Sequence, residues 1–174
     1  NAQLDSEKII EQSEIKIGES IFANFNIITK VKVKQNRYIE DAIVSKKMPD
    51  TIKIEVKERI VSFQVKTESG YYIYIDDQGY IIEYSQEPRE LITIVGMDIT
   101  EENIENKKRL EDDDLNIKLE NILHIKEQAI EKGIYDKISE MQVENEYILK
   151  LDSLNLTINL GNATNIKDRM DYVK

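Results

Sequence analysis

Two groups of side chains in this 174-residue sequence have the types and spacing that acid–base or metal chemistry needs. Asp76 and Asp77 are adjacent carboxylates, and carboxylate pairs bind hard cations or share the acid and base roles in glycoside hydrolysis. The single histidine, His124, has Glu120 and Glu127 within one helical turn, which would suit a general base. A base also needs a nucleophile to activate, and no Ser or Thr lies in a nucleophile-elbow context. We therefore interpret His124 as a helix-surface residue.

The acidic runs are better explained by turn and helix chemistry than by a site. Side chains of adjacent strand residues point to opposite faces, so Asp76 and Asp77 share a site only if a turn bends them together. The run 112–114 lacks the alternate spacing and the downstream glycine of a calcium loop, and it predicts a helix start. The chain has no Cys, which excludes thiolate chemistry. We expect a protein that is not an enzyme and that holds no cofactor or metal.

Composition excludes other classes of function. A net charge of −10 and a pI near 4.8 argue against nucleic-acid binding, which needs clustered Lys and Arg. Hydrophobic residues make up 40% of the chain, which is enough for a core. No apolar run approaches the roughly 18 residues of a membrane span, and no signal peptide is visible. Because the sequence starts at Asn1 without Met, we expect a processed or truncated chain.

The clearest periodicity lies in residues 48–65. Pro49 cannot donate a backbone hydrogen bond, so a strand should begin at about Thr51. Glu58 and Arg59 then interrupt the alternation, and a second strand follows. The apolar residues that alternate with polar ones, first in one strand and then in the other, are Ile52, Ile54 and Val56, followed by Val61, Phe63 and Val65. The charged pair therefore marks a junction between two sheets.

The order and spacing of these residues resemble the FtsQ/DivIB family of bacterial cell-division proteins. The matching positions are Pro49, Ile52, Ile54, Val56, Glu58 and Arg59, then Tyr71 to Asp76 and Gly79. In that family the Glu-Arg pair closes a POTRA (polypeptide-transport-associated) domain and opens a second, β-rich domain. The resemblance implies an α+β fold: a POTRA-like domain at 1–57, with helices packed on a small sheet, and a mixed or antiparallel β-domain with helices at 58–174. It also implies a first strand before Asn1 and one or more last strands after Lys174.

Local signals predict the other elements. A helix is expected over residues 4–13, with Ile9 and Ile10 facing inward. Helical spacing and strand alternation conflict over 20–34, where the resemblance favours a helix followed by a strand over 38–44. Further on we expect a hairpin over 71–84, a strand over 91–95, a helix beginning at Thr100 with Ile99 and Ile104 as its staple, a helix over 113–132, strands over 147–151 and 154–160, and a closing helix to Lys174. In helix 113–132, one face should hold Leu115, Leu119, Ile122 and Ala129 or Ile130.

A binding role has a physical mechanism in strand 154–160. If the sheet ends there, its edge exposes unpaired backbone groups that bind an extended partner by strand addition. Alternatively, residues after Lys174 pair with this strand and move the partner-binding edge to a terminal strand, which is the interpretation we favour. The exposed residues expected to flank the partner are Leu154, Asn155, Thr157, Asn159, Arg169 and Tyr172.

The resemblance implies a non-catalytic scaffold of the division complex. Its expected partners are FtsL-like and FtsB/DivIC-like single-pass proteins, and its expected location is the cell membrane at the septum, through an N-terminal span absent from this chain. This region would lie outside the cytoplasm. Two alternatives are a POTRA-type polypeptide-binding module of an outer-membrane translocation or assembly system, and an extracellular enzyme that uses Asp76 and Asp77.

Overall fold

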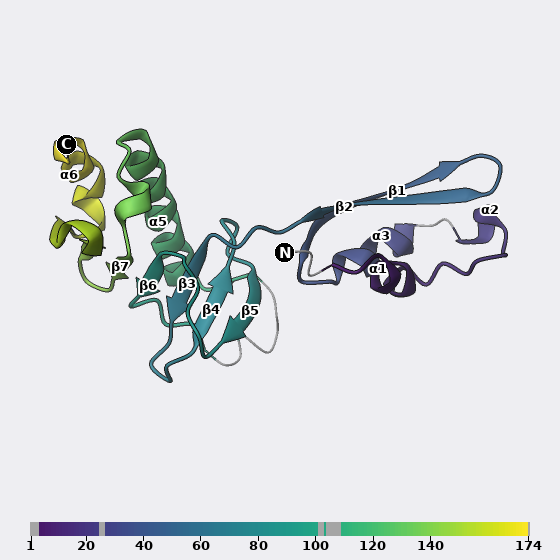
Figure 1. Cartoon of the computed structure of the whole chain (residues 1–174), viewed down its shortest axis with the longest axis horizontal. Coiled ribbons are helices and arrows are strands. Elements are labelled where there is room, and N and C mark those ends of the chain that lie inside the picture. Colours follow the sequence, from purple (N-terminus) through teal and green to yellow (C-terminus); the bar gives the residue numbers. More distant parts are fainter. Residues whose placement is uncertain (1–3, 25–26, 101–102, 104–108, 174) are drawn as a thin grey trace. The chain divides into compact units, whose positions relative to one another are not determined.

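The computed structural model describes residues 4–24, 27–100, 103 and 109–173, and divides the chain into two compact units, Asn1–Arg59 and Ile60–Lys174 (Figure 1). Both units combine helices with strands, so the α+β class is confirmed. The boundary expected after Lys57 falls inside the last strand of the first unit, which ends at Glu58. None of the helices in the described ranges is long and apolar enough to cross a membrane.

The first unit packs short helices against one hairpin. Its elements are α1 (Ser6–Ser13), α2 (Ile21–Asn24), α3 (Ile27–Lys34), β1 (Ile39–Lys47) and β2 (Thr51–Glu58). The end of the stretch 20–34, where the two patterns conflicted, is helical in α3. Val33 is fully buried while Val31 lies exposed, so the two residues do not share a face as they would in a strand. β2 begins at Thr51 as predicted, and Ile52, Ile54 and Val56 are half-buried.

The core of this unit is small. It consists of Ile9, Val33, Ile39 and Ala42, with Leu4, Ile54 and Val56 packed against it. The prediction for Ile10 was wrong: its side chain is 47% exposed, whereas Ile9 is buried. Neighbouring residues on a helix point about 100° apart, so a helix as short as α1 buries only the narrow stripe that faces its neighbours.

The second unit is built on a seven-stranded sheet with the order β5-β4-β3-β6-β7-β8-β9. Its strands are β3 (Phe63–Lys66), β4 (Tyr72–Ile75), β5 (Ile81–Ser85), β6 (Thr93–Val95), β7 (Glu140–Val143), β8 (Tyr147–Leu151) and β9 (Leu156–Gly161). β6 pairs in parallel with β3 and with β7, and all other neighbours are antiparallel. Two helices, α5 (Asp113–Glu131) and α6 (Ile166–Tyr172), lie side by side and share the core with the strands (Figure 1).

Strand β7 was not predicted. Met141 and Val143 are buried and Glu140 and Gln142 are half-buried, so the alternation is present. It lasts only four residues, which is too short for periodicity to separate from a loop. Because β7 joins β6 on one side and β8 on the other, it connects the two halves of the sheet.

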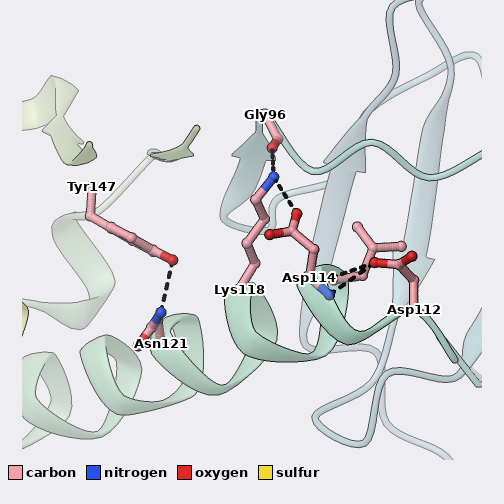
Figure 2. Close-up of polar contacts among 7 residues, drawn as sticks. Gly96, Asp112, Asp114, Lys118, Asn121 and Tyr147 are labelled. Atoms are coloured by element: carbon pink, nitrogen blue, oxygen red, sulfur yellow. Dashed lines mark hydrogen bonds and ion pairs between the residues drawn. The ribbon is translucent and has the colours of Figure 1, made fainter. Parts of the chain in front are cut away.

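Helix α5 follows its predicted face and start. Asp112 caps it by accepting hydrogen bonds from the backbone N–H groups of Asp114 and Leu115 (Figure 2). The buried residues are Leu115, Leu119, Ile122, Ile125 and Ala129. Ile130 is 55% exposed, so Ala129 is the inward residue of the predicted pair. Gly133 ends the helix region with a positive φ of 67°.

Polar side chains of α5 reach two parts of the sheet. Lys118 Nζ donates to the carbonyl of Gly96, just after β6, and pairs with Asp114, while Asn121 donates to the hydroxyl of Tyr147 at 2.9 Å (Figure 2). Tyr147 is the first residue of β8 and lies opposite Gly161 of β9. The helix therefore helps to position the strand that precedes β9.

The predicted helix beginning at Thr100 lies mostly outside the described residues, and its staple residue Ile104 is among those not described. The capping contacts at its start are visible. Asn103 Oδ1 accepts from both the N–H and the hydroxyl of Thr100, and the hydroxyl of Thr100 accepts from the N–H of Asn103. This reciprocal pair is the pattern expected of a helix N-terminus.

Candidate functional site

The last strand of the sheet, β9, pairs only with β8 in the part of the chain that the structure describes. The orientation of its backbone follows from hydrogen bonds on the far side of β8. The carbonyl of Lys150 accepts from the N–H of Ser139, on the β7 side. In an antiparallel ladder the N–H and C=O of one residue point to the same side, so Lys150 does not bond to Thr157 opposite it. The N–H and C=O of Thr157 therefore point away from β8, toward the open edge.

The same alternation turns Asn159 outward, two residues further along β9. Its carbonyl accepts from Nη1 of Arg169, on α6, at 3.4 Å. Its side-chain oxygen accepts from the N–H of Gly161 at 2.7 Å, and its amide nitrogen donates to Glu146 at 2.8 Å. This end of the edge is thus partly satisfied by side chains of the same unit.

Gly161 allows the close approach of α6 to this strand. A Cβ at this position would lie 3.1 Å from the guanidinium carbon of Arg169, and the φ of Gly161 is +70°. Both features favour glycine. The structure therefore brings the predicted residues Asn159 and Arg169 together.

The other end of β9 differs from the prediction. Strand 154–160 was expected to begin at Leu154, but the strand begins at Leu156, and Leu154 lies in the 3-10 turn η2 (Asp152–Leu154). Asn155 adopts a left-handed conformation, with φ 48°, and its N–H donates to the carbonyl of Asp152. The connection from β8 is therefore longer than the two residues expected.

The apolar and charged side chains near the edge are accessible. Leu154 is 53% exposed and Leu156 is 47% exposed. Tyr172, the last residue of α6, is 83% exposed. Lys150 of β8 pairs with Glu140, which raises the pKa of Lys150. The open edge thus combines free backbone groups at Thr157 with exposed leucines beside it.

The candidate chemical residues are arranged for structure. Asp76 is buried, and its Oδ1 accepts from the N–H groups of Gln78 and Tyr80 at 2.9 and 2.8 Å, as expected for a turn. Both carboxylate oxygens of Asp77 instead bind Lys126 Nζ, at 2.7 and 2.8 Å. The two carboxylates therefore serve different contacts.

His124 lies half-buried on α5 and lines a shallow depression with Glu120 and Glu127. Its Nε2 is shielded from solvent and has no hydrogen-bond partner among the described residues. Within the same described ranges, no group of three His, Asp or Glu residues is placed to hold a metal ion.

Lys126 joins three segments, and its removal should destabilise the second unit. Besides Asp77, it contacts Ser62 Oγ at 3.4 Å and lies 5.2 Å from the centroid of the Phe63 ring. We expect Lys126→Ala to lower the free energy of unfolding by about 1–2 kcal/mol, because an ion pair and a cation–π contact are lost together. Urea unfolding measures this change, and Lys137→Ala, at an exposed position, is the matched control. An equal loss of stability in both variants would show that the contacts of Lys126 with the three segments are unimportant.

Comparisons with known proteins identify a domain match and several relatives. A family model described as POTRA domain, FtsQ-type, matches residues 1–59. The chain is 24% identical, over 174 aligned residues, to the cell division protein DivIB of Clostridium botulinum (strain Loch Maree / Type A3), covering 98% of the chain and 66% of that protein. It is 38% identical to DivIB of Clostridium acetobutylicum over 84 residues, covering 48% and 33%. The chain is thus similar to FtsQ/DivIB cell division proteins over almost its whole length, and its first unit matches the FtsQ-type POTRA domain.

A relative named FtsQ is also similar to the chain. The cell division protein FtsQ of Rickettsia bellii is 35% identical over 97 residues, which cover 53% of the chain and 35% of that protein. The chain therefore spans between about a third and two thirds of the length of these FtsQ/DivIB relatives. The family resemblance carried by residues 49–79 is confirmed.

The FtsQ-type match ends at Arg59, which is also the last residue of the first compact unit. Glu58 is the final residue of β2 and lies opposite Ile39, while the N–H of Arg59 donates to the carbonyl of Tyr38 at 2.8 Å. Both residues predicted at the junction are thus held by the first unit.

Sequence reasoning missed Glu146 at the open edge, where it binds the side chain of Asn159. A weak signal was present, because Glu146 immediately precedes the predicted strand 147–151 and Asn159 lies near the end of the next strand. The pairing depends on a register shift beside Ile148. Register shifts of this kind leave no clear mark in a single sequence.

Proposed function

We propose that this FtsQ/DivIB chain is a non-catalytic scaffold of the division complex, which binds FtsL-like and FtsB/DivIC-like partners during septum formation. The observation that carries the proposal is the open β9 edge, with the backbone groups of Thr157 directed outward. The matched relatives named as cell division proteins support the process in which it acts. The chain spans only part of the length of those relatives. The role of the whole protein is therefore proposed here and not taken from them.

The mechanism is growth of the sheet by an extended segment beside β9. Backbone hydrogen bonds to Thr157 hold the added segment without depending on the side chains of that segment. The exposed side chains of Leu154 and Leu156 supply apolar contacts at the start of the strand. Asn159 and Arg169 border the other end, where the added segment must fit against α6.

We further propose that residues following Lys174 in the natural protein pair with β9 first, and that a partner segment then adds to that new edge. The first unit takes recruitment contacts. An N-terminal span preceding this chain holds the protein in the cell membrane at the septum, with both units outside the cytoplasm. These proposals rest on the family resemblance and on the open edge.

Titration with the partners' coiled-coil regions tests the proposal. Two forms are compared by calorimetry: the chain ending at Lys174, and a chain extended to its natural C-terminus. We expect the extended form to bind at least about tenfold more tightly, because it supplies the terminal strand edge. Equal binding by both forms would place the partner elsewhere than the terminal strand. Absence of binding by both forms would oppose the scaffold role and favour a polypeptide-binding module of a translocation system.

A further inference from the structure

The first unit carries three strongly exposed apolar side chains at one end. Ile17 is 93% exposed, Phe22 is 69% exposed and Met48 is 66% exposed. Isolated exposed apolar residues need no explanation, but a group of them marks an interaction surface. None of the three residues belongs to the small core of this unit.

These residues come from two segments that meet in space. Ile17 and Phe22 lie before and within α2, whereas Met48 lies in the turn between β1 and β2. Lys46 Nζ lies 4.6 Å from the centroid of the Phe22 ring, and residues 15–19 and 21 line the same groove as residues 50–52. Figure 1 shows α2 beside the turn of the hairpin. We call residues 15–22 and 46–51 the hairpin end.

The charge of the hairpin end is positive. It contains Lys16, Lys46 and Lys47 against Glu19 and Asp50, which leaves a net charge of +1. Lys16 pairs with Glu19, at 3.7 Å. Lys46 and Lys47 immediately precede Met48 in the sequence.

The two units also differ in net charge, and the first unit is the more positive one. Residues 1–59 hold 11 Lys and Arg and 10 Asp and Glu, a net charge of +1, whereas residues 60–174 hold 13 and 24, a net charge of −11. An anionic surface therefore repels the second unit and not the first.

We propose that the hairpin end binds the surface of an anionic membrane. Phe22, Met48 and Ile17 enter the boundary between headgroups and acyl chains, which takes up apolar side chains without requiring a shaped pocket. Lys46 and Lys47 face the lipid phosphates, and a lysine near an anionic membrane attracts it appreciably. A membrane fits better than an acidic protein groove, because the apolar side chains come from a turn and a short helix and form no continuous stripe.

Co-sedimentation with vesicles tests the proposal on the full 174-residue chain. The vesicles contain phosphatidylcholine with phosphatidylglycerol, or phosphatidylcholine alone. We expect binding to the anionic vesicles, weakened about tenfold by Phe22→Ser with Met48→Ser, because buried apolar surface is lost. Lys46→Gln with Lys47→Gln should weaken binding about fivefold for each charge removed. The loss caused by the lysine substitutions should shrink on vesicles of phosphatidylcholine alone, whereas the loss caused by the apolar substitutions should not.

The matched control is Ile130→Ser with Tyr172→Ser, which removes two exposed apolar residues from the second unit. This control should bind the vesicles like the unchanged chain. Absence of binding to anionic vesicles, or equal losses in the control and in the hairpin-end variants, would overturn the proposal. A dimer in sedimentation velocity that the Phe22 and Met48 substitutions abolish would also overturn it and would assign the surface to a second copy. The lysine variant keeps the test valid if the apolar variant fails to fold by circular dichroism.

Discussion

Thr157→Pro, made in the chain extended to its natural C-terminus, should reduce partner binding by about 100-fold or more while leaving the second unit folded. Proline lacks the N–H that an added strand needs, and an unmet backbone partner costs about 1–3 kcal/mol in addition to the lost register. The effect is expected whether the added strand belongs to the partner or to the chain itself, because both arrangements require the β9 edge.

The fold should tolerate this proline because the N–H group that it removes does not bond to the neighbouring strand. The N–H of Thr157 points away from β8, since Lys150 opposite it is bonded to Ser139 on the other side. Edge strands accept proline at such positions. In the chain ending at Lys174, where β9 pairs only with β8 among the described residues, the free energy of unfolding should fall by no more than about 1–2 kcal/mol, which urea unfolding measures alongside the binding titration.

Two control variants separate the edge from the strand. Ile158→Pro removes an N–H that points toward β8 and should cost about 3 kcal/mol or more, with loss of the ladder. Thr157→Val keeps the N–H and should bind almost like the unchanged chain. If Thr157→Pro binds partners as tightly as the unchanged chain, the β9 edge is not the docking site and strand addition there is wrong.

Gln64→Ala should cause a large loss of stability, about 2–4 kcal/mol. Gln64 is 2% exposed, and its side-chain nitrogen lies within hydrogen-bond distance of the Arg89 and Leu91 carbonyls and of Thr93 Oγ1. Its side-chain oxygen accepts from the N–H of Arg89 at 2.8 Å. Removing this amide leaves several buried groups unpaired, and each unpaired group costs about 1–3 kcal/mol unless water reaches it.

The loss should also affect how the sheet is assembled. Gln64 lies on β3 opposite Thr93 of β6, at one of the two parallel pairings in the sheet. Its side chain holds residues 89–93, so the variant should loosen the entry into β6. Hydrogen exchange of the backbone amides at residues 89–95 measures this loosening, because exchange reports local opening.

An exposed glutamine provides the control for this variant. Gln86 makes a side-chain contact with the hydroxyl of exposed Tyr71, at 3.1 Å. Gln86→Ala should change the free energy of unfolding by less than about 0.5 kcal/mol. If Gln64→Ala also lowers the free energy of unfolding by less than about 0.5 kcal/mol, water replaces the buried amide, and the expected large loss is wrong.

Much of the local structure was predictable from residues near one another in the chain. The alternation after Pro49 identified β2, and the Asp112 run and Gly133 marked the two ends of the α5 region. The turn role of Asp76 was also predicted, because its oxygen bonds to N–H groups two and four residues ahead. Such signals involve contacts within a few residues, and a single sequence displays them directly.

Faces and packing were less predictable. In strand β4, Tyr74 is fully buried on the face opposite Ile73. The loop after β5 covers it: its hydroxyl donates to the carbonyl of Glu87, and Arg89 lies 4.2 Å above its ring. Periodicity shows which residues share a face, but it does not show that a distant loop covers that face.

The sequence by itself showed the resemblance to the FtsQ/DivIB family, the α+β class and the order of most elements, because spacing and alternation are properties of neighbouring residues. Only the tertiary structure decided which strand is the open edge, which way Thr157 points and that Lys126 binds Asp77. These features depend on partners that are far apart in the chain: Lys126 and Asp77 are separated by 49 positions. They also depend on β7, which joins the two halves of the sheet. The physical reason is that strand pairing selects its partner and register by the fit of whole faces.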